Sequence, residues 1–217
     1  MIPPGWPTEA RAAIALQRRL AAEVVCEDRL DGVATVAGVD AAMPLGRAEI
    51  QAAAVALRFP GLEPLAEATA RGAAPFPYIP GLLSFRETPA VLIALARLGR
   101  APDLILCDGH GLAHPRRFGL ACHIGVLTDT PTIGIAKSRL VGTHDEPAET
   151  RGAWVPLTDG EAVIGAVLRT RAHVRPVYVS VGHRVSLASA IELVLACTPR
   201  YRLAEPIRAA DRLSRRL

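Results

Sequence analysis

Hydrophobic and polar positions follow two different periods along this chain of 217 residues. Between Pro7 and Asp28, apolar residues recur at helical spacing among Arg and Glu, which predicts an N-terminal amphipathic helix over about 7–28. The period then shortens. The segments 33–40, 49–59 and 62–69 have β-strand character and are separated by short turns. We therefore expect these three segments to form an antiparallel meander.

Strands and helices alternate in the middle of the chain. Residues 86–98 have a helical pattern that ends at Gly99, a residue typical of helix ends. The segments 103–107, 117–127 and 131–136 read as strand, helix and strand. Such a βαβ unit pairs its two strands in parallel.

The last third of the chain predicts a hairpin, a strand and two helices. The predicted strands are 154–157, 162–168 and 177–181, with the hairpin dipeptide Asp159-Gly160 between the first two. Ser186 is a favourable helix cap, and Pro206 suits the first turn of a terminal helix. A meander followed by βα units predicts an α/β fold with a ribonuclease H-like mixed sheet flanked by helices. We expect a single domain over 1–217.

Composition and charge restrict the class of protein only loosely. The formal net charge is +4 with a pI of about 9.2, which permits an anionic partner without requiring one. The four cysteines lie far apart, and the first residues carry no targeting signal, so we expect reduced thiols that fill the core of a cytoplasmic protein. No apolar run reaches the roughly 20 residues of a membrane span. We expect a monomer that does not interact with membranes.

Four acidic residues lie at positions suited to metal chemistry. Asp40 and Asp108 each close a predicted strand, Glu87 follows the start of a helix, and Asp211 lies in the terminal helix. If the first and fourth strands are neighbours, Asp40 and Asp108 face each other and repel unless a cation lies between them. Oxygen ligands of this kind suit Mg²⁺ or Mn²⁺, and two such ions about 4 Å apart support cleavage of a phosphodiester.

Each acid also has a purely structural explanation. An aspartate at a strand end often forms a turn, and Glu87 could answer the helix dipole. Asp211 could pair with Arg208 or Arg215 along its helix. These explanations account for each acid singly, but not for their occurrence together with a proline-rich turn at 77–87 and a single lysine, Lys137.

Two further features are unusual. The run PYIPGLLSFRE over 77–87 must turn, because proline lacks the backbone donor and constrains the residue before it, and the turn displays Tyr78 and Ile79. Lys137 is the only lysine in a chain that has no asparagine. A zinc site is also conceivable at Cys107, His110, His114, Cys122 and His123. The absence of a paired C-x-x-C spacing argues against it.

Five sequence blocks resemble the endonuclease V family, the inosine-directed repair nucleases. They are VAGVDAA at 36–42, PYIPGLLSFRE at 77–87, DGHGLAHPRRFGLACHIGV at 108–126, PTIGIAKSRLVG at 131–142, and VGHRVSLASA with PIRAADRL near the end. The resemblance implies a ribonuclease H-like fold. It also implies Mg²⁺-dependent cleavage of DNA, with Mn²⁺ as a substitute, one nucleotide 3′ of a deoxyinosine.

The resemblance also assigns roles to residues. The metal-binding and catalytic acids would be Asp40, Glu87, Asp108 and Asp211, with Lys137 near the scissile phosphate. The strand-separating wedge would be Pro77, Tyr78, Ile79 and Pro80, and the base pocket would contain Gly81, Leu83, Gly109, Gly119 and Leu120. His114 matches a family residue near the lesion strand. From their charge, we expect Arg116, Arg117, Arg139, Arg212, Arg215 and Arg216 as candidates for phosphate contacts, although the last three could equally form a solvated face.

Three functions are consistent with these residues. The first is a metal-dependent endonuclease acting on deoxyinosine in DNA. The second is the same chemistry on inosine in RNA, which a contact to the ribose 2′-hydroxyl would indicate. The third is a non-catalytic lesion-binding protein, which the presence of all four acids disfavours.

Overall fold

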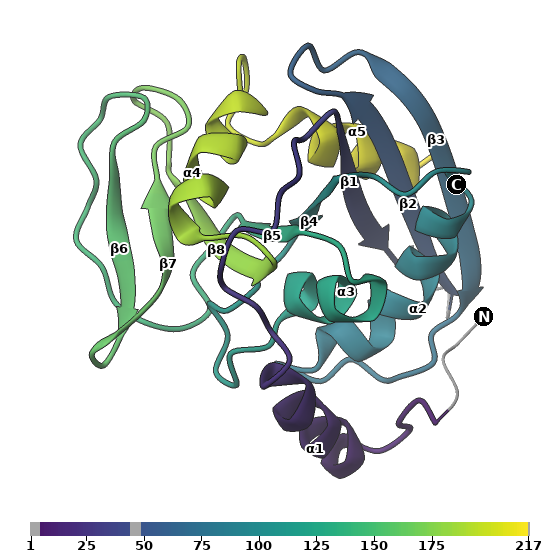
Figure 1. Ribbon diagram of the computed structural model, residues 1–217. Helices are drawn as coiled ribbons and strands as arrows, with labels where there is room; N and C mark the ends of the chain where they lie inside the picture. Colours follow the sequence, from purple (N-terminus) through teal and green to yellow (C-terminus); the bar gives the residue numbers. More distant parts are fainter. Residues whose placement is uncertain (1–4, 44–48, 217) are drawn as a thin grey trace.

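A single mixed sheet organises the protein, for which a computed structural model describes residues 5–43 and 49–216 (Figure 1). The strands are β1 (Thr35–Ala42), β2 (Glu49–Arg58), β3 (Pro64–Ala73), β4 (Leu104–Asp108), β5 (Thr132–Ala136), β6 (Trp154–Asp159), β7 (Ala162–Leu168) and β8 (Val177–His183). The helices are α1 (Ala10–Ala21), α2 (Leu83–Ala96), α3 (Leu120–Thr128), α4 (Leu187–Ala196) and α5 (Glu205–Ser214). The strand order is β3-β2-β1-β4-β5-β8-β7-β6.

The pairing of the strands confirms the predicted fold class. β1, β2 and β3 form the antiparallel meander, while β1 pairs in parallel with β4 and β4 in parallel with β5. β8 pairs antiparallel with both β5 and β7, so it joins the βαβ unit to the β6–β7 hairpin. The position of β8 inside the sheet was not predicted, because element order does not determine which edge a later strand joins.

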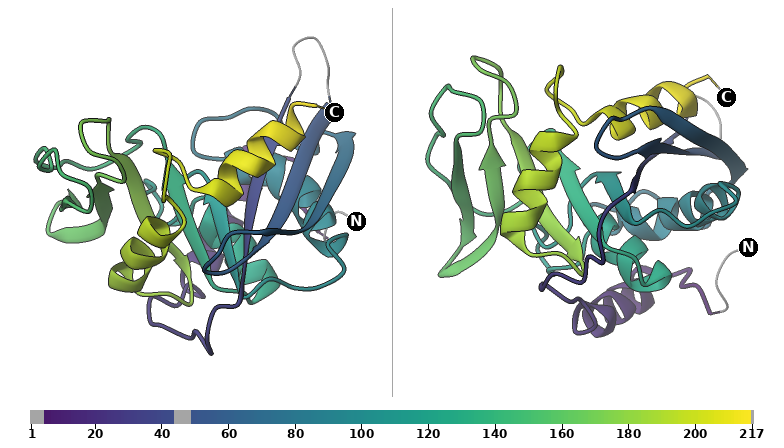
Figure 2. Two further views of the ribbon diagram at one scale, coloured as in Figure 1. Left: turned by 90° about the horizontal axis from the view of Figure 1, so that it is seen from above. Right: turned by 45° about the horizontal axis from the view of Figure 1, so that its top comes forward.

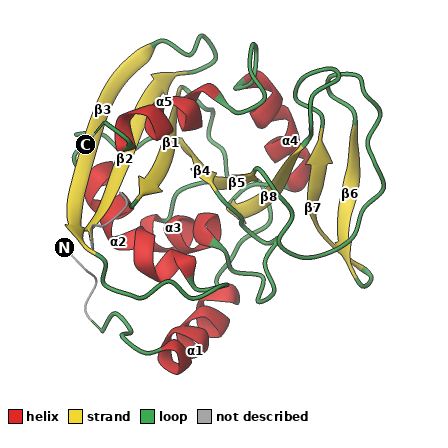
Figure 3. Ribbon diagram, turned by 180° about the vertical axis from the view of Figure 1, so that it is seen from behind, coloured by secondary structure: helices red, strands yellow, loops and turns green. Residues whose placement is uncertain are grey.

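Alternate residues of the central strands face two different helical layers, which Figure 2 shows on either side of the sheet. On one face, Val36, Leu104 and Leu106 pack in a cluster with residues of α4 and α5. On the other face, Val39 and Ile105 pack with residues of α2 and α3. This alternation follows from the period of two in a strand. α1 lies outside α3 (Figure 3).

Two predicted helices are shorter in the structure. The N-terminal helix covers Ala10–Ala21 instead of 7–28, because the chain beyond it takes its hydrogen bonds elsewhere: the Arg184 N–H donates to the Val25 carbonyl at 2.7 Å. The helix predicted over 117–127 begins at Leu120, since Arg117 has φ 53° and cannot lie in a right-handed helix. Of the cysteines expected in the core, Cys26 is exposed and the other three are buried.

Within the described residues, no helix is long and apolar enough to cross a membrane. The single domain over 1–217 stays a prediction, and residues 1–4, 44–48 and 217 of it lie outside the described part of the chain.

Candidate active site

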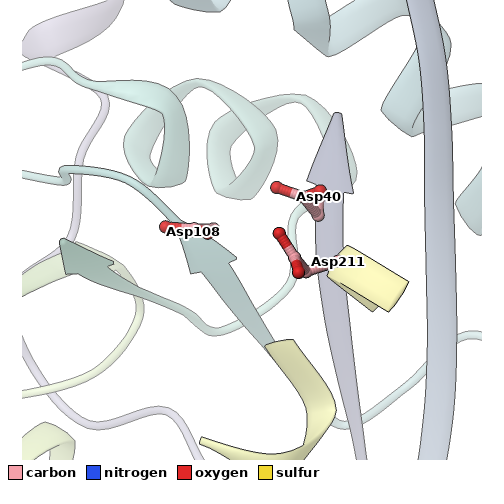
Figure 4. Close-up of side chains that lie close together, drawn as sticks. All are labelled: Asp40, Asp108 and Asp211. Atoms are coloured by element: carbon pink, nitrogen blue, oxygen red, sulfur yellow. The ribbon is translucent and has the colours of Figure 1, made fainter. Parts of the chain in front are cut away.

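Three predicted acids converge where the parallel strands end. Asp40 in β1, Asp108 at the end of β4 and Asp211 in α5 each offer a carboxylate oxygen, and these oxygens lie within 4.8 Å of one another. Figure 4 shows the three side chains lying close together on the two strands and the helix. Of the groups of His, Cys, Asp and Glu in the described residues, this carboxylate triad is the one close enough to hold a metal ion. Within the described residues, Cys107, His110, His114, Cys122 and His123 are not among the groups close enough to share an ion.

Strand register and one glycine explain the convergence. β1 and β4 are parallel with Val39 opposite Cys107, so the next residues, Asp40 and Asp108, project on the same face of the sheet. Gly38 lies two residues before Asp40 on that face, and a Cβ there would lie 2.1 Å from the Pro206 carbonyl carbon. The missing side chain lets the start of α5 approach the sheet closely, which brings Asp211 over the strand ends.

The electrostatics of the triad are those expected of like charges held together. Burial raises the pKa of Asp40, and the charges of Asp108 and Asp211 raise it further. Two groups oppose this effect: the Ser214 hydroxyl donates to Asp40 Oδ2 at 2.7 Å, and Lys137 lies near. Lys137 Nζ itself donates to Asp108 Oδ2 at 2.5 Å. Ser214, one turn beyond Asp211, was not predicted.

Asp211 combines both roles considered from the sequence. Arg215 pairs with its Oδ1 at 2.8 Å, one helical turn away, as the structural explanation supposed. The same carboxylate nevertheless belongs to the triad. The ion pair therefore does not remove Asp211 from the site.

Glu87 lies near the triad but is not among the three residues that converge. It projects from α2, which covers the opposite face of the sheet from α5, so it approaches the strand ends from the other side. Burial, followed by the charges of Asp40 and Asp108, raises the pKa of Glu87 to about 8. The carboxyl group is thus coupled electrostatically to the triad.

A cavity of 330 Å³ lies beside the triad. It is lined by Tyr78, Pro80, Gly81, Leu83, Ser84, Gly109, His110, His114, Gly119, Leu120, Ser138 and Leu140. All five residues predicted for a base pocket are among them. Ser84, Ser138 and Leu140 were given no role from the sequence, although the last two lie within three residues of Lys137.

Glycine is required at two positions of the cavity wall. Gly81 has φ +79°, which an L side chain rarely adopts. A Cβ at Gly119 would lie 2.2 Å from the His110 carbonyl oxygen. Backbone therefore forms part of the wall because side chains do not fit there.

The carbonyl oxygen of Gly81 accepts hydrogen bonds from three side chains. The donors are Arg116 Nη2 at 2.6 Å, His114 Nε2 at 3.1 Å and Gln17 Nε2 at 3.3 Å. Arg116 Nε also donates to Gln17 Oε1 at 2.5 Å, so the helix α1 is tied to this carbonyl. We call these three side chains and the Gly81 carbonyl the Gly81 clamp. Gln17 was not predicted, although it is a polar residue between Ala13 and Leu20 on the buried side of the helix.

The clamp uses groups that were predicted to contact nucleic acid. His114 is 5% exposed and donates through Nε2, while its Nδ1 accepts from the Arg116 N–H at 3.1 Å. Burial and the neighbouring Arg116 charge lower the pKa of His114 to about 4, so the ring is neutral. Both ring nitrogens are thus occupied within the protein. Arg116 is occupied in the same way, whereas Arg139 and the terminal Arg212, Arg215 and Arg216 are exposed.

The predicted wedge projects from the protein beside the cavity. Pro77, Tyr78 and Pro80 are exposed, and Tyr78 has 66% of its surface accessible. Ile79 is half-buried against an apolar cluster that contains Phe76 and Phe85. The turn thus presents one aromatic ring outward while its aliphatic neighbour anchors it.

The fold and this site define a class of protein. Carboxylates from neighbouring parallel strands and from the last helix meet on a ribonuclease H-like sheet, and their oxygens are the donors that divalent cations prefer. The protein is therefore a ribonuclease H-like α/β protein with an acidic site beside a cavity. More particularly, the chain belongs to the endonuclease V family, because the family model described as Endonuclease V matches residues 18–212.

Individual relatives agree with this assignment over nearly the full chain. The endonuclease V of Roseiflexus castenholzii is 57% identical over 209 residues, covering 96% of this chain and 93% of that protein. The endonuclease V structure from Streptomyces avermitilis has a TM-score of 0.95 at 49% identity, covering 99% of this chain and 95% of that one. The Ciona intestinalis endonuclease V, in complex with a 24mer DNA containing an inosine followed by a ribo-adenosine, has a TM-score of 0.83 at 28% identity, covering 94% and 95%. The family predicted from the sequence blocks is confirmed.

Proposed function

We propose that this protein is a metal-dependent endonuclease of DNA repair that nicks DNA one nucleotide 3′ of deoxyinosine. One observation carries the proposal: Lys137 binds Asp108 of the carboxylate triad, while the next residue, Ser138, lines the cavity. A base held in the cavity and a phosphate held at the triad are thus brought together by consecutive residues. The family assignment and the relative that was solved with inosine-containing DNA support this reading.

The donor set of the triad fits Mg²⁺, with Mn²⁺ as a substitute. The three carboxylate oxygens lie within 4.8 Å of one another, which is close enough for all three to bind one cation, and Mg²⁺ prefers oxygen ligands of this kind. Asp40, Asp108 and Asp211 would hold the ion, and Glu87 would add a carboxylate from the opposite face. When bound, the metal supplies Lewis-acid stabilisation of the phosphate and an acidified water.

The protein side chains orient the phosphate and balance its charge. Lys137 places its ammonium next to Asp108, where a compact positive charge stabilises negative charge that develops on the scissile phosphate. Ser214 holds Asp40 in one orientation through its hydroxyl. Both groups thereby fix the carboxylates before substrate arrives.

The cavity and the wedge would select the base. Hypoxanthine presents a carbonyl acceptor and a ring N–H, where adenine presents an amino group and a ring acceptor, so backbone donors and acceptors near Gly81, Gly109 and Gly119 can tell them apart. Tyr78 would replace the stacking lost when the base leaves the duplex. The prolines on either side keep the turn stiff, which limits the entropy lost on insertion.

A nicking assay on matched duplexes tests the proposal. The wild-type protein with Mg²⁺ should cut an inosine-containing DNA duplex and leave the adenine-containing control intact, whereas Asp40→Ala should bind without cutting. Faster cutting of an inosine-containing RNA would favour the ribonuclease alternative. Binding without cutting by the wild-type protein would favour the non-catalytic one.

We further propose that the enzyme acts as a cytoplasmic monomer. Light scattering of the purified protein, alone and with an inosine-containing duplex, tests the monomer. A mass of two chains would contradict it.

A further inference from the structure

A second hollow adjoins the cavity on the side of Lys137. It has a volume of 430 Å³ and is lined by Lys137, Ser138, Arg139, Glu146, Arg175, Pro176, Tyr178 and Arg202. Ser138 lines both the hollow and the cavity. We call this hollow the basic groove. It begins at the residue that binds Asp108 and leads away from the triad toward the start of β8.

Positive charge dominates the basic groove. Four of its lining residues are cationic, and its single acid, Glu146, is paired with Arg169 outside the groove at 2.8 Å. Arg202 donates to the carbonyls of Lys137, Arg175 and Pro176 at 2.8 to 2.9 Å. Its guanidinium therefore fixes the wall of the groove, and carbonyl groups leave its charge unneutralised.

Arg139 and Arg175 are exposed, and within the described part of the chain their guanidinium groups make no hydrogen bond or ion pair. Two other arginines near the site differ from them, because Arg215 pairs with Asp211 and Arg117 pairs with Asp159. Lys137 pairs with Asp108, but the three arginines of the groove have no acidic partner among the described residues. Cations gathered in one concavity in this way repel one another, and the arrangement attracts a polyanion.

We propose that the basic groove binds backbone phosphates of the DNA strand that passes through the active site, with Arg139 and Arg175 as the contacting side chains. The inference rests on the proposed function, and it adds the path of the strand away from the scissile phosphate and a new residue, Arg175. Guanidinium groups suit this task because their planar donors match two phosphate oxygens at once. The contacts carry no sequence information, so they serve every lesion context equally.

The salt dependence of binding tests the groove directly. Binding to an inosine-containing duplex is measured by fluorescence anisotropy with Ca²⁺ across a series of salt concentrations, for wild type, Arg139→Ala, Arg175→Ala and the double variant. The logarithm of the binding constant falls linearly with the logarithm of the salt concentration, and each lost phosphate contact should reduce the steepness of this fall by about 0.9. Arg175→Lys should retain the slope, because it keeps the charge.

Arg100→Ala is the matched control. Arg100 is exposed and lies before β4, at the opposite end of that strand from Asp108, so its loss should leave the slope unchanged. In the nicking assay the two groove variants should raise KM and keep kcat, since the contact is the same in ground and transition states. Wild-type slopes in both groove variants, at unchanged melting temperature, would overturn the inference.

The outcomes separate this inference from the proposed function. If the wild-type protein nicks inosine-containing DNA and the groove variants bind like Arg100→Ala, the groove inference fails and the function stands. If the wild-type protein does not nick and the groove variants still lose slope on duplex DNA, the groove binds phosphates and the proposed chemistry fails.

Discussion

The Gly81 clamp lines the cavity and the carboxylate triad adjoins it at Gly109, the residue after Asp108, yet the two regions treat polar groups in opposite ways. At the triad, Asp40, Asp108 and Asp211 hold like charges together, and burial with mutual repulsion raises the pKa of Asp40. At the clamp, one carbonyl oxygen receives three donors. Lys137 and Arg215 pair with two of the three carboxylates, so the first region keeps an excess of negative charge, whereas the second region satisfies one polar group several times over.

This difference separates a binding site from its scaffold. Carboxylates held close together repel one another until a cation binds between them. Relief of this repulsion favours the binding of a divalent ion at the triad. A fully hydrogen-bonded turn is already in its working conformation, so little order remains to be gained when substrate arrives. The triad should therefore control chemistry, and the clamp should control how the wedge is presented.

Removing one charge from the triad should give the largest effect on activity. We expect Asp108→Ala to lower the nicking rate by more than about 100-fold. Mutation of residues that only hydrogen-bond to a metal ligand already lowers activity or metal affinity by about 10- to 100-fold. The same change should raise the melting temperature in EDTA, since it relieves repulsion on Asp40. Single-turnover kinetics and calorimetry measure the two effects.

Asp103→Ala is the control at the other end of the same strand. Asp103 accepts from the backbone N–H groups of Ala34 and Thr35 and from the Thr35 hydroxyl. Its loss should reduce stability and leave nicking per folded molecule intact. Equal nicking rates for Asp108→Ala and Asp103→Ala would contradict the catalytic role of the triad end of β4.

The metal-free protein should lose stability as pH rises. The pKa of Glu87 is raised to about 8 by burial and by the charges of Asp40 and Asp108, against 4.5 as its ordinary value. Between these values the folded state keeps a proton that the unfolded state has released, so the free energy of unfolding falls by roughly 3 kcal/mol from pH 5 to pH 8. Urea titrations in EDTA measure the fall, and Glu87→Gln should flatten it. A Glu87→Gln profile that matches wild type would refute the coupling.

A buried histidine next to the clamp, His123, should make stability depend on pH in the opposite direction. Its ring packs on Phe118, whose carbonyl accepts a hydrogen bond from Gln17. His123 is buried, bonds the Ser84 hydroxyl at 3.0 Å and stacks on Trp6, and burial lowers its pKa to about 3. Its unfolded form takes up a proton below about pH 6.5, whereas the folded form does not, so stability falls by about 2 kcal/mol from pH 7 to pH 5. His123→Phe should reduce the fall in the free energy of unfolding between pH 7 and pH 5, whatever its effect on stability at pH 7. Urea titrations at both pH values compare the two proteins, and an undiminished loss would contradict the assignment.

Breaking the clamp should give a smaller effect that depends on the substrate. Gln17→Ala removes the donor to the Phe118 carbonyl at 2.6 Å and the acceptor of Arg116, so we expect a loss of about 1–3 kcal/mol in the free energy of unfolding. Nicking of an inosine duplex should fall more than nicking of a single-stranded inosine oligonucleotide, because only the duplex needs the wedge. Arg19→Ala changes an exposed residue on the same helix. It should alter neither the ratio of duplex to single-strand nicking nor the free energy of unfolding.

Equal losses on the two substrates would mean that Gln17 acts on overall stability alone. Tyr78→Ala provides the reference, since it removes the exposed ring directly and leaves the clamp bonds in place. Matching substrate ratios for Gln17→Ala and Tyr78→Ala would link the clamp to the wedge.

The elements and the family could be predicted because they depend on local signals. The Asp159-Gly160 turn, the Ser186 cap and the meander each follow from a few neighbouring residues, and the structure contains all three. Ser186 forms the predicted helix cap, because its hydroxyl accepts a hydrogen bond from the Ser189 N–H. Sequence blocks identified the family for a similar reason, as several long motifs occur in one order.

Helix ends and supporting residues were harder to predict, because they depend on partners far away in the chain. The helix expected over 7–28 ends at Ala21, since the following backbone pairs with residues 183–184, which are more than 150 positions distant. Gln17 and Ser214 are ordinary polar residues in the sequence. They acquire a role only when α1 meets Gly81 and α5 meets Asp40.

By itself, the sequence determined which acids, which glycines and which lysine this protein has available, and which strands and helices carry them. Only the tertiary structure decided that three of the acids share one point while Glu87 approaches from the far face of the sheet. The physical reason is that register and helix packing set the face on which a side chain emerges. These depend on close approaches such as that of α5 to Gly38, which no local pattern encodes.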